Sequence, residues 1–191
     1  ILSHDLLLKM KAVVQRVAEA AVAIGGETIS RIGPGLLVLL GVEEIDDATD
    51  VAWLAGKIAR MRIFGDAEGK MNLSVVETGG GVLVVSQFTL HASTKKGNRP
   101  SFIRAGAPTH SEPLYEAFCS AMERETGRAV MRELGQELRA QGVEVVIAGR
   151  ETELMEWREK TGMDRLRPMR LRQFPTLGQA VATLQAELQR A

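Results

Sequence analysis

The chain has 191 residues, of which 45% are hydrophobic and 25% charged, as is usual for a globular domain. Lysine plus arginine and aspartate plus glutamate both number 24, which excludes a generally basic nucleic-acid-binding protein and leaves only a local cluster of cations for phosphate contact. The single cysteine, Cys119, excludes an intrachain disulfide and a multi-cysteine metal site, and it favours a reducing compartment. The three histidines lack a ligand-like spacing, so we expect no metal and no cofactor.

Residues 1–9 contain a short apolar patch that is interrupted by charges. The patch is too short for a signal peptide and far too short to span a membrane. Because Met10-Lys11 is typical of a natural start, we interpret residues 1–9 as leader residues. We therefore expect a cytoplasmic protein with no membrane partner.

The first half of the chain predicts β-strands around one helix. Residues 11–17 and 20–24 followed by 28–32, with Gly25-Gly26 as the turn, are typical of a β-hairpin. The apolar run 36–42 predicts a central strand. Apolar residues at spacings of three and four predict a helix from about residue 48 to Arg62, with Asp46 or Asp47 as its cap.

A second strand and helix follow the turn at residues 65–69. Val82 to Val85 predict a buried strand, and a helix is expected from Ser111 or Glu112 to Glu125, with Gly127 ending it. This order predicts an α+β fold with mostly antiparallel β-sheets and packed helices.

From Arg128 onward the pattern changes. Met131, Leu134 and Leu138 predict a helix, and residues 143–148 predict a strand. Two further helices, at 152–161 and after Pro175, enclose a short strand within 169–174. This order indicates an α/β tail of parallel crossover units, which by themselves lack partner strands.

The strand at 82–85 ends on polar side chains, because Ser86, Gln87 and Thr89 follow it directly. Next comes a loop with Lys95, Lys96 and Arg99, in a span from 78 to 111 that also contains Arg104 and no acidic residue. A polar strand end beside unopposed cations predicts a site for an anionic ligand. The alternatives are polar groups that satisfy the neighbouring backbone and a loop that is merely solvated.

No histidine lies where it would activate Ser86 as a nucleophile. His91 is near in sequence, but residues five apart lie on opposite faces if the strand continues. Phe88 faces either the core or a ligand, and the core is the safer interpretation.

Six segments, in the same order, carry a resemblance to D-aminoacyl-tRNA deacylase, which frees tRNA from mischarged D-amino acids. The resemblance covers residues 10 to about 128. It implies a deacylase-like α+β fold, a homodimer, and hydrolysis of the ester bond of D-aminoacyl-tRNA without a metal. The segments are residues 10–17, 32–42, 62–64, 69–72, 83–90 and 96–102.

The resemblance also implies roles for individual residues. Ser86, Gln87, Phe88 and Thr89 would line the catalytic pocket for the aminoacyl-adenosine end of tRNA. The terminal ribose hydroxyl would help to activate water, while backbone donors and the Thr89 region hold the ester carbonyl. The substrate-binding candidates beside this pocket are Arg16, Met71, Asn72, Lys95, Lys96 and Arg99.

The sequence departs from the family near its C-terminus. The family has an Asn-x-Pro-x-Thr motif with a Gly-Pro pair that crosses the dimer interface and rejects L-amino acids. Here the only Gly-Pro is Gly33-Pro34, so Arg16, which matches the arginine that anchors that loop, would lack its partner. Residues 130–191 instead resemble the second half of a STAS domain, on the segments 136–149 and 174–181.

We therefore predict three regions: the leader 1–9, a deacylase-like domain 10–128 without its C-terminal strands, and a STAS-like segment 129–191. The predicted function is chirality proofreading by D-aminoacyl-tRNA hydrolysis. The alternative is a catalytically impaired fusion or frame-changed protein, whose STAS-like tail binds a protein partner.

Overall fold

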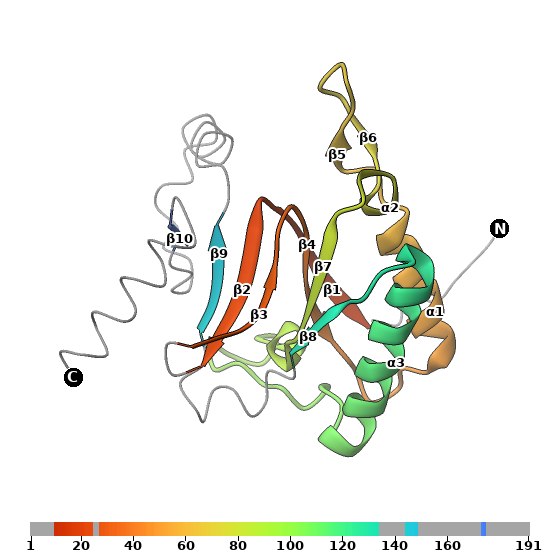
Figure 1. Cartoon of the computed structure of the whole chain (residues 1–191). Helices are drawn as coiled ribbons and strands as arrows, with labels where there is room; N and C mark the ends of the chain where they lie inside the picture. The colour runs from red at the N-terminus through yellow and green to blue at the C-terminus, as the bar shows by residue number, and fades with distance from the viewer. Residues whose placement is uncertain (1–9, 25–26, 134–143, 149–172, 175–191) are drawn as a thin grey trace.

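The computed structural model describes residues 10–24, 27–133, 144–148 and 173–174. Two four-stranded sheets face each other, and helices α1 and α3 cover the outer face of one of them (Figure 1). The bounds of the elements are β1 Lys11–Val17, β2 Glu19–Ile24, β3 Glu27–Ile32, β4 Gly35–Gly41, α1 Ala48–Ala59, β5 Phe64–Gly65, β6 Met71–Leu73, α2 Val75–Thr78, β7 Gly81–Ser86, the 3₁₀ helix η1 Phe88–His91, α3 Pro108–Thr126, β8 Met131–Glu133, β9 Glu144–Ala148 and β10 Gln173–Phe174.

The sheet beneath the helices has the strand order β1-β4-β7-β8. Its apolar side chains alternate between two cores, because successive residues of a strand point to opposite faces. Leu36 and Val84 pack with the helices, whereas Leu37 and Leu83 pack toward the second sheet. Strand β4 is internal, which confirms the predicted central strand.

The α+β class is confirmed, but this sheet is not mainly antiparallel. Only β1 pairs with β4 in the antiparallel sense, while β4–β7 and β7–β8 are parallel. Parallel neighbours require a crossover connection. Helix α1 lies within the connection from β4 to β7, and α3 lies within the connection from β7 to β8.

The second sheet has the order β10-β9-β2-β3. The antiparallel pair β2–β3 confirms the hairpin, although its turn residues lie outside the described part. The expected first arm is divided, because β1 pairs in one sheet and β2 in the other. The chain therefore passes from sheet to sheet at Ala18, between the two strands.

Local hydrogen bonds set the ends of the two long helices. Asp47 caps α1 in a reciprocal arrangement with Asp50, while Asp46 is buried and accepts from the N–H groups of Met10 and Glu43 at 2.7 and 2.6 Å. Helix α1 ends at Ala59, slightly before the predicted Arg62. Helix α3 begins earlier than expected because Pro108 suits the first helical turn, and it ends at Gly127 in the left-handed conformation.

The predicted helix at Met131 is wrong, because Met131–Glu133 form β8 beside β7. Met131 packs against the core between the two sheets, and a residue in a short strand can be buried there as well as one in a helix. Strand β9 is confirmed, and it has partners: it pairs with β2 and β10. The predicted helices at 152–161 and after Pro175, and the rest of the helix through Leu138, lie outside the described residues.

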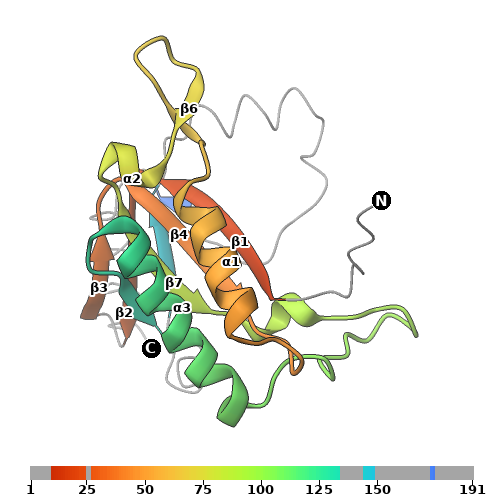
Figure 2. The ribbon, with the colours of Figure 1, turned by 90° about the vertical axis from the view of Figure 1, so that its right-hand side faces the viewer.

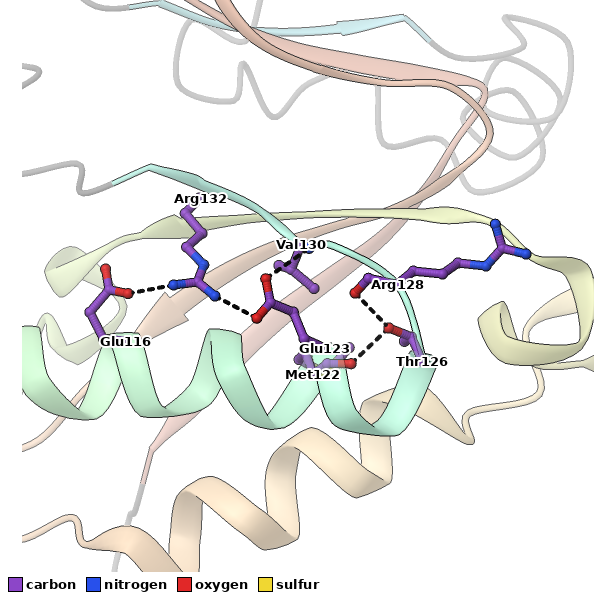
Figure 3. A network of polar contacts seen from close by, with 7 residues as sticks. All are labelled: Glu116, Met122, Glu123, Thr126, Arg128, Val130 and Arg132. Carbon is purple, nitrogen blue, oxygen red and sulfur yellow. Dashed lines mark hydrogen bonds and ion pairs between the residues drawn. The ribbon is translucent and has the colours of Figure 1, made fainter.

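A polar network holds the start of β8 against α3 (Figure 3). Arg132 bridges Glu116 at 2.8 Å and Glu123 at 2.7 Å, and Glu123 also accepts from the N–H of Val130 at 3.3 Å. The hydrogen bond from Val130 and the adjacent guanidinium of Arg132 lower the pKa of Glu123. This network directs the chain from the end of α3 back along β7.

Candidate functional site

The candidate site lies at the end of β7, where the strand gives way to η1. The N–H of Gln87 donates to the carbonyl oxygen of Leu40 at 2.7 Å, so the turn is seated on the end of β4. A Cβ added at Gly41 would lie 3.0 Å from His91 Nε2 and 3.1 Å from the oxygen of Gln87. The missing side chain at Gly41 therefore allows η1 to approach β4 this closely.

Two polar side chains of the turn hold each other. The side-chain amide of Gln87 donates to Thr89 Oγ1. A hydroxyl that accepts from an amide still has its own proton to donate. Both side chains are half-buried, and the Thr89 hydroxyl keeps its proton for a further acceptor. Lys11 adds a cation at this end of the sheet, since its Nζ lies 3.1 Å from the oxygen of Leu90.

Phe88 is half-buried and packs outside the main cores, contrary to the interpretation as a core residue. Its ring meets that of Phe102 edge to face, with centroids 5.4 Å apart and planes at 71°. Phe102 lies on the loop that follows η1. The structure therefore joins the predicted polar strand end and the predicted cationic loop through an aromatic contact.

The two ends of the cationic loop are joined by backbone hydrogen bonds. Ser93 and Ser101 exchange backbone hydrogen bonds of 2.8 and 2.9 Å, and Lys95, Lys96 and Arg99 are exposed between them. None of the described residues forms an ion pair with these three side chains. Arg104 is different, because it pairs with Glu43 from the segment after β4. The expectation of four unopposed cations therefore reduces to three.

The site contains no activated side-chain nucleophile. The strand ends at Ser86, so the face argument for His91 does not apply; His91 is instead 2% exposed, with no hydrogen-bond partner for either ring nitrogen among the described residues. Cys119 lies on the buried face of α3, where burial raises the pKa of its thiol to about 12. Neither Ser86 nor Cys119 therefore has the activated environment that nucleophilic catalysis requires.

Three predicted substrate-binding residues lie away from this turn. Arg16 pairs in register with Leu36, which is level with Val82, whereas Ser86 is level with Leu40. The two levels differ by four strand residues, or about 13 Å at about 3.3 Å per residue. The Arg16 guanidinium donates to the oxygen of Ile63 at 2.9 Å.

Met71 and Asn72 also lie away from the turn. Both oxygens of Asn72, backbone and side chain, accept from Arg62, and the Met71 side chain is 71% exposed. They lie on β6, in the projecting β5–β6 hairpin, away from the loop that follows η1 (Figure 2). Within one chain, the structure brings Ser86–Thr89 together with the cationic loop but not with Arg16, Met71 and Asn72.

The part of the chain that the structure describes contains no group of three or more His, Cys, Asp or Glu side chains arranged to hold a metal ion. Nor does any described helix have the length and apolarity needed to cross a membrane. Sequence reasoning missed Glu43, since nothing in Glu43-Glu44 signals that the first is buried and the second exposed. Gly41 could have been singled out as a glycine at the end of an apolar strand. Its spatial neighbours, however, come from residues 87–91, which are distant in sequence.

Comparison with known proteins extends these observations. Residues 13–155 match the family described as D-Tyr-tRNA(Tyr) deacylase, and the match continues past residue 128 into the segment predicted to be STAS-like. The D-aminoacyl-tRNA deacylase of Akkermansia muciniphila is 66% identical over 109 residues, 57% of this chain and 73% of that protein. The one of Opitutus terrae is 60% identical over 119 residues, 62% of this chain and 79% of that protein.

Two solved structures resemble this one. The c-Myc DNA Unwinding Element Binding Protein is 34% identical, with a TM-score of 0.65, and the match covers 73% of this chain and 91% of the other. A probable eukaryotic D-amino acid tRNA deacylase, 19% identical with a TM-score of 0.54, shares the fold over 62% of this chain and 69% of its own. Since the family match spans well over half of the sequence, the chain belongs to the D-Tyr-tRNA(Tyr) deacylase family.

Proposed function

We propose that the protein hydrolyses the ester bond of D-aminoacyl-tRNA and releases free tRNA and the D-amino acid. One observation supports this most strongly: the Ser86–Thr89 turn, where Thr89 accepts from Gln87 and can still donate, is joined through Phe88 and Phe102 to a loop with three exposed cations. An aminoacyl-tRNA end presents an ester and phosphates together, and this juxtaposition offers a hydrogen-bond donor for one and positive charge for the other.

The reaction needs a water molecule, and no side-chain nucleophile takes part. The water oxygen bonds to the ester carbonyl carbon, and the carbonyl oxygen becomes an oxyanion to which Thr89 Oγ1 and backbone N–H groups of the turn donate. A terminal ribose hydroxyl of the tRNA helps to remove the proton of the water, as the family resemblance implies. The ester C–O bond then breaks, and the departing ribose oxygen takes up a proton.

The test compares D-Tyr-tRNA with L-Tyr-tRNA as substrates of the full chain. Faster release from D-Tyr-tRNA is expected of a chirality-proofreading enzyme. Equal release from both would retain the hydrolysis and remove the proofreading role. Absence of release from either would contradict the proposed function and favour the catalytically impaired alternative.

We also propose a homodimer, because the predicted substrate-binding residues lie in two separate places and do not meet within a chain. A second copy would supply Arg16, Met71 and Asn72 to the Ser86–Thr89 turn of the first. Sedimentation equilibrium is expected to give twice the chain mass. A monomer at concentrations that support full activity would contradict this assembly.

The STAS-like resemblance of the tail, its protein partner, the three-region division and the cytoplasmic location remain predictions. Most of residues 129–191 lie outside the described part of the structure. Of the described strands after residue 128, β8 pairs with β7 and β9 pairs with β2, which supports a contribution of this segment to the deacylase fold. Removal of residues 175–191 tests whether the tail is needed, since an independent interaction module would leave hydrolysis unchanged.

A further inference from the structure

An ion pair with a buried carboxylate ties the segment directly after the cationic loop to the end of β4. The Glu43 side chain is only 4% exposed and accepts from Arg104 Nε, whose own side chain is 37% exposed. The backbone reinforces the ion pair. Glu43 and Ala105 form an isolated antiparallel β-bridge, and the N–H of Gly106 donates to the oxygen of Val42 at 2.9 Å. The segment from Arg104 to Gly106, which directly follows the loop, is therefore held by both charge and backbone.

The ion pair between Glu43 and Arg104 is a poor source of folding stability. Burying a carboxylate costs free energy that its partner repays only in good geometry, and Glu43 Oε2 has no hydrogen-bond partner among the described residues. Removal of Arg104 would leave the whole carboxylate buried without a counter-charge. Such a pair is better explained by the geometry that it fixes.

The geometry in question is that of the loop relative to η1. Arg104 follows Phe102 by two residues, and the Phe102 ring packs on Phe88 of η1. The same loop carries Lys95, Lys96 and Arg99. A shift of Arg104 would thus move both the aromatic contact at the turn and the cations beyond it.

We propose that Glu43 and Arg104 are positioning residues, which set the distance between the three loop cations and Thr89 so that one tRNA end reaches both. The inference rests on the proposed function. The pair touches neither the ester nor the reacting water, and it acts by holding Phe102 and the loop in place. Its loss therefore affects substrate binding more than the chemical step.

The first measurement is the steady-state hydrolysis of D-Tyr-tRNA by Glu43→Gln, Arg104→Gln and Arg104→Lys. The two glutamine variants are expected to raise KM about tenfold while kcat stays within about twofold, because the loop is misplaced and the turn is not. Arg104→Lys, which keeps the charge, is expected to recover most of the loss. Glu125→Gln, which breaks the exposed pair with Arg60 between α1 and α3, is the matched control and should leave KM unchanged.

The second measurement is hydrogen exchange at the loop amides of Ser93, Ser101 and Gly106, which requires no activity. Both glutamine variants are expected to exchange there at least about tenfold faster, while the Glu125→Gln control exchanges like the wild type. If Glu43→Gln does not fold, Arg104→Gln alone provides the test. The Arg104 side chain is partly exposed, so its replacement is better tolerated.

The two measurements separate the inference from the proposed function. Unchanged exchange in the glutamine variants overturns the positioning role, even if KM rises, because the charge would then act on the substrate directly. Faster exchange with an unchanged KM overturns it as well. If the wild type does not hydrolyse D-Tyr-tRNA at all, the proposed function fails, and exchange alone decides whether the pair holds the loop.

Discussion

The two ends of β7 use the neighbouring strand β4 in different ways. At the Gly81 end, Gly35 of β4 lies so close that an added Cβ would overlap the carbonyl oxygen of Gly81. At the Ser86 end, Gly41 of β4 leaves room for η1, and polar side chains follow the strand. Gly35 at the first end allows two strand backbones to pack closely, whereas Gly41 at the second end allows the candidate catalytic turn to pack on β4. We therefore expect changes at the first end to affect mainly stability and changes at the second end to affect mainly function.

The largest effect is expected at the Gly81 end. Gly35→Ala forces the β4–β7 pair apart, because the obstacle is backbone and cannot rotate away. We expect a loss of about 3 kcal/mol or more in the free energy of unfolding, measured by urea denaturation. Gly33→Ala, whose Cβ would meet nothing within 4 Å, is the control. Equal stability of the two variants would show that this close approach is unimportant.

At the Ser86 end, Thr89→Ala removes the hydroxyl that accepts from Gln87. We expect kcat to fall by about 10² to 10³ if that hydroxyl donates to the oxyanion, with the free energy of unfolding changed by less than about 0.5 kcal/mol. Thr89→Ser retains the hydroxyl and should restore most of kcat. An unchanged rate for Thr89→Ala in single-turnover assays would move the site elsewhere.

Gly41→Ala is expected to have an intermediate effect. The added Cβ presses on His91 and Gln87 at 3.0 to 3.1 Å, so η1 must shift by a few tenths of an ångström. We expect kcat to fall about tenfold with a loss of only about 1 kcal/mol in stability, the reverse of the balance at Gly35. Gly65→Ala, whose Cβ would come no nearer than 4.0 Å to another atom, is the control. Loss of stability without loss of kcat would contradict the functional reading of Gly41.

The loop cations should be visible in the salt dependence of binding. Each phosphate contact contributes about 0.7 to 0.9 to the slope of log K against log salt, so Lys95→Gln, Lys96→Gln and Arg99→Gln should each lower the slope by up to about that amount. Lys57→Gln on α1 serves as the control, since Lys57 is an exposed cation in the last turn of that helix. Slopes that are identical to the wild-type slope would leave the loop without a role in phosphate binding.

The smallest effect concerns acid stability at the junction of α3 and β8. The pKa of Glu123 is lowered in the folded protein, chiefly by the N–H of Val130 and then by Arg132. A carboxyl with a lowered folded pKa stabilises the fold above its unfolded pKa, and this contribution is lost as the pH falls through the folded pKa. Glu123→Gln should therefore lose less stability than the wild type between pH 6 and pH 3. Parallel losses would contradict the role of the network.

The sequence predicts most of the elements because their signals are local. Asp47 before an apolar period of three and four, and the run ending at Ser86, identify a helix and a strand without other information. The prediction of a helix at Met131 was wrong because a single apolar residue at that position fits a strand and a helix equally. The pairing of Arg104 with Glu43, and the burial of His91, depend on contacts across the fold, which no local pattern contains.

The same reason explains which part of the site was predicted. Ser86–Thr89 and Lys95–Arg99 are close in sequence, and the structure joins their segments through the contact of Phe88 with Phe102. Arg16, Met71 and Asn72 were grouped with them by resemblance alone. The structure puts Arg16 at the far end of the sheet and puts Met71 and Asn72 in the separate β5–β6 hairpin, so a single chain does not bring them to the turn.

The most direct test of the account is a crystal structure of the full chain with a non-hydrolysable amide analogue of D-tyrosyl-adenosine. We predict that the carbonyl oxygen of the analogue accepts from Thr89 Oγ1 and backbone N–H groups of the turn, with the adenosine leading toward the loop of Lys95, Lys96 and Arg99. An analogue bound at the Gly81 end of β7, or bound at the Ser86 end with its carbonyl out of reach of Thr89, would contradict the assignment.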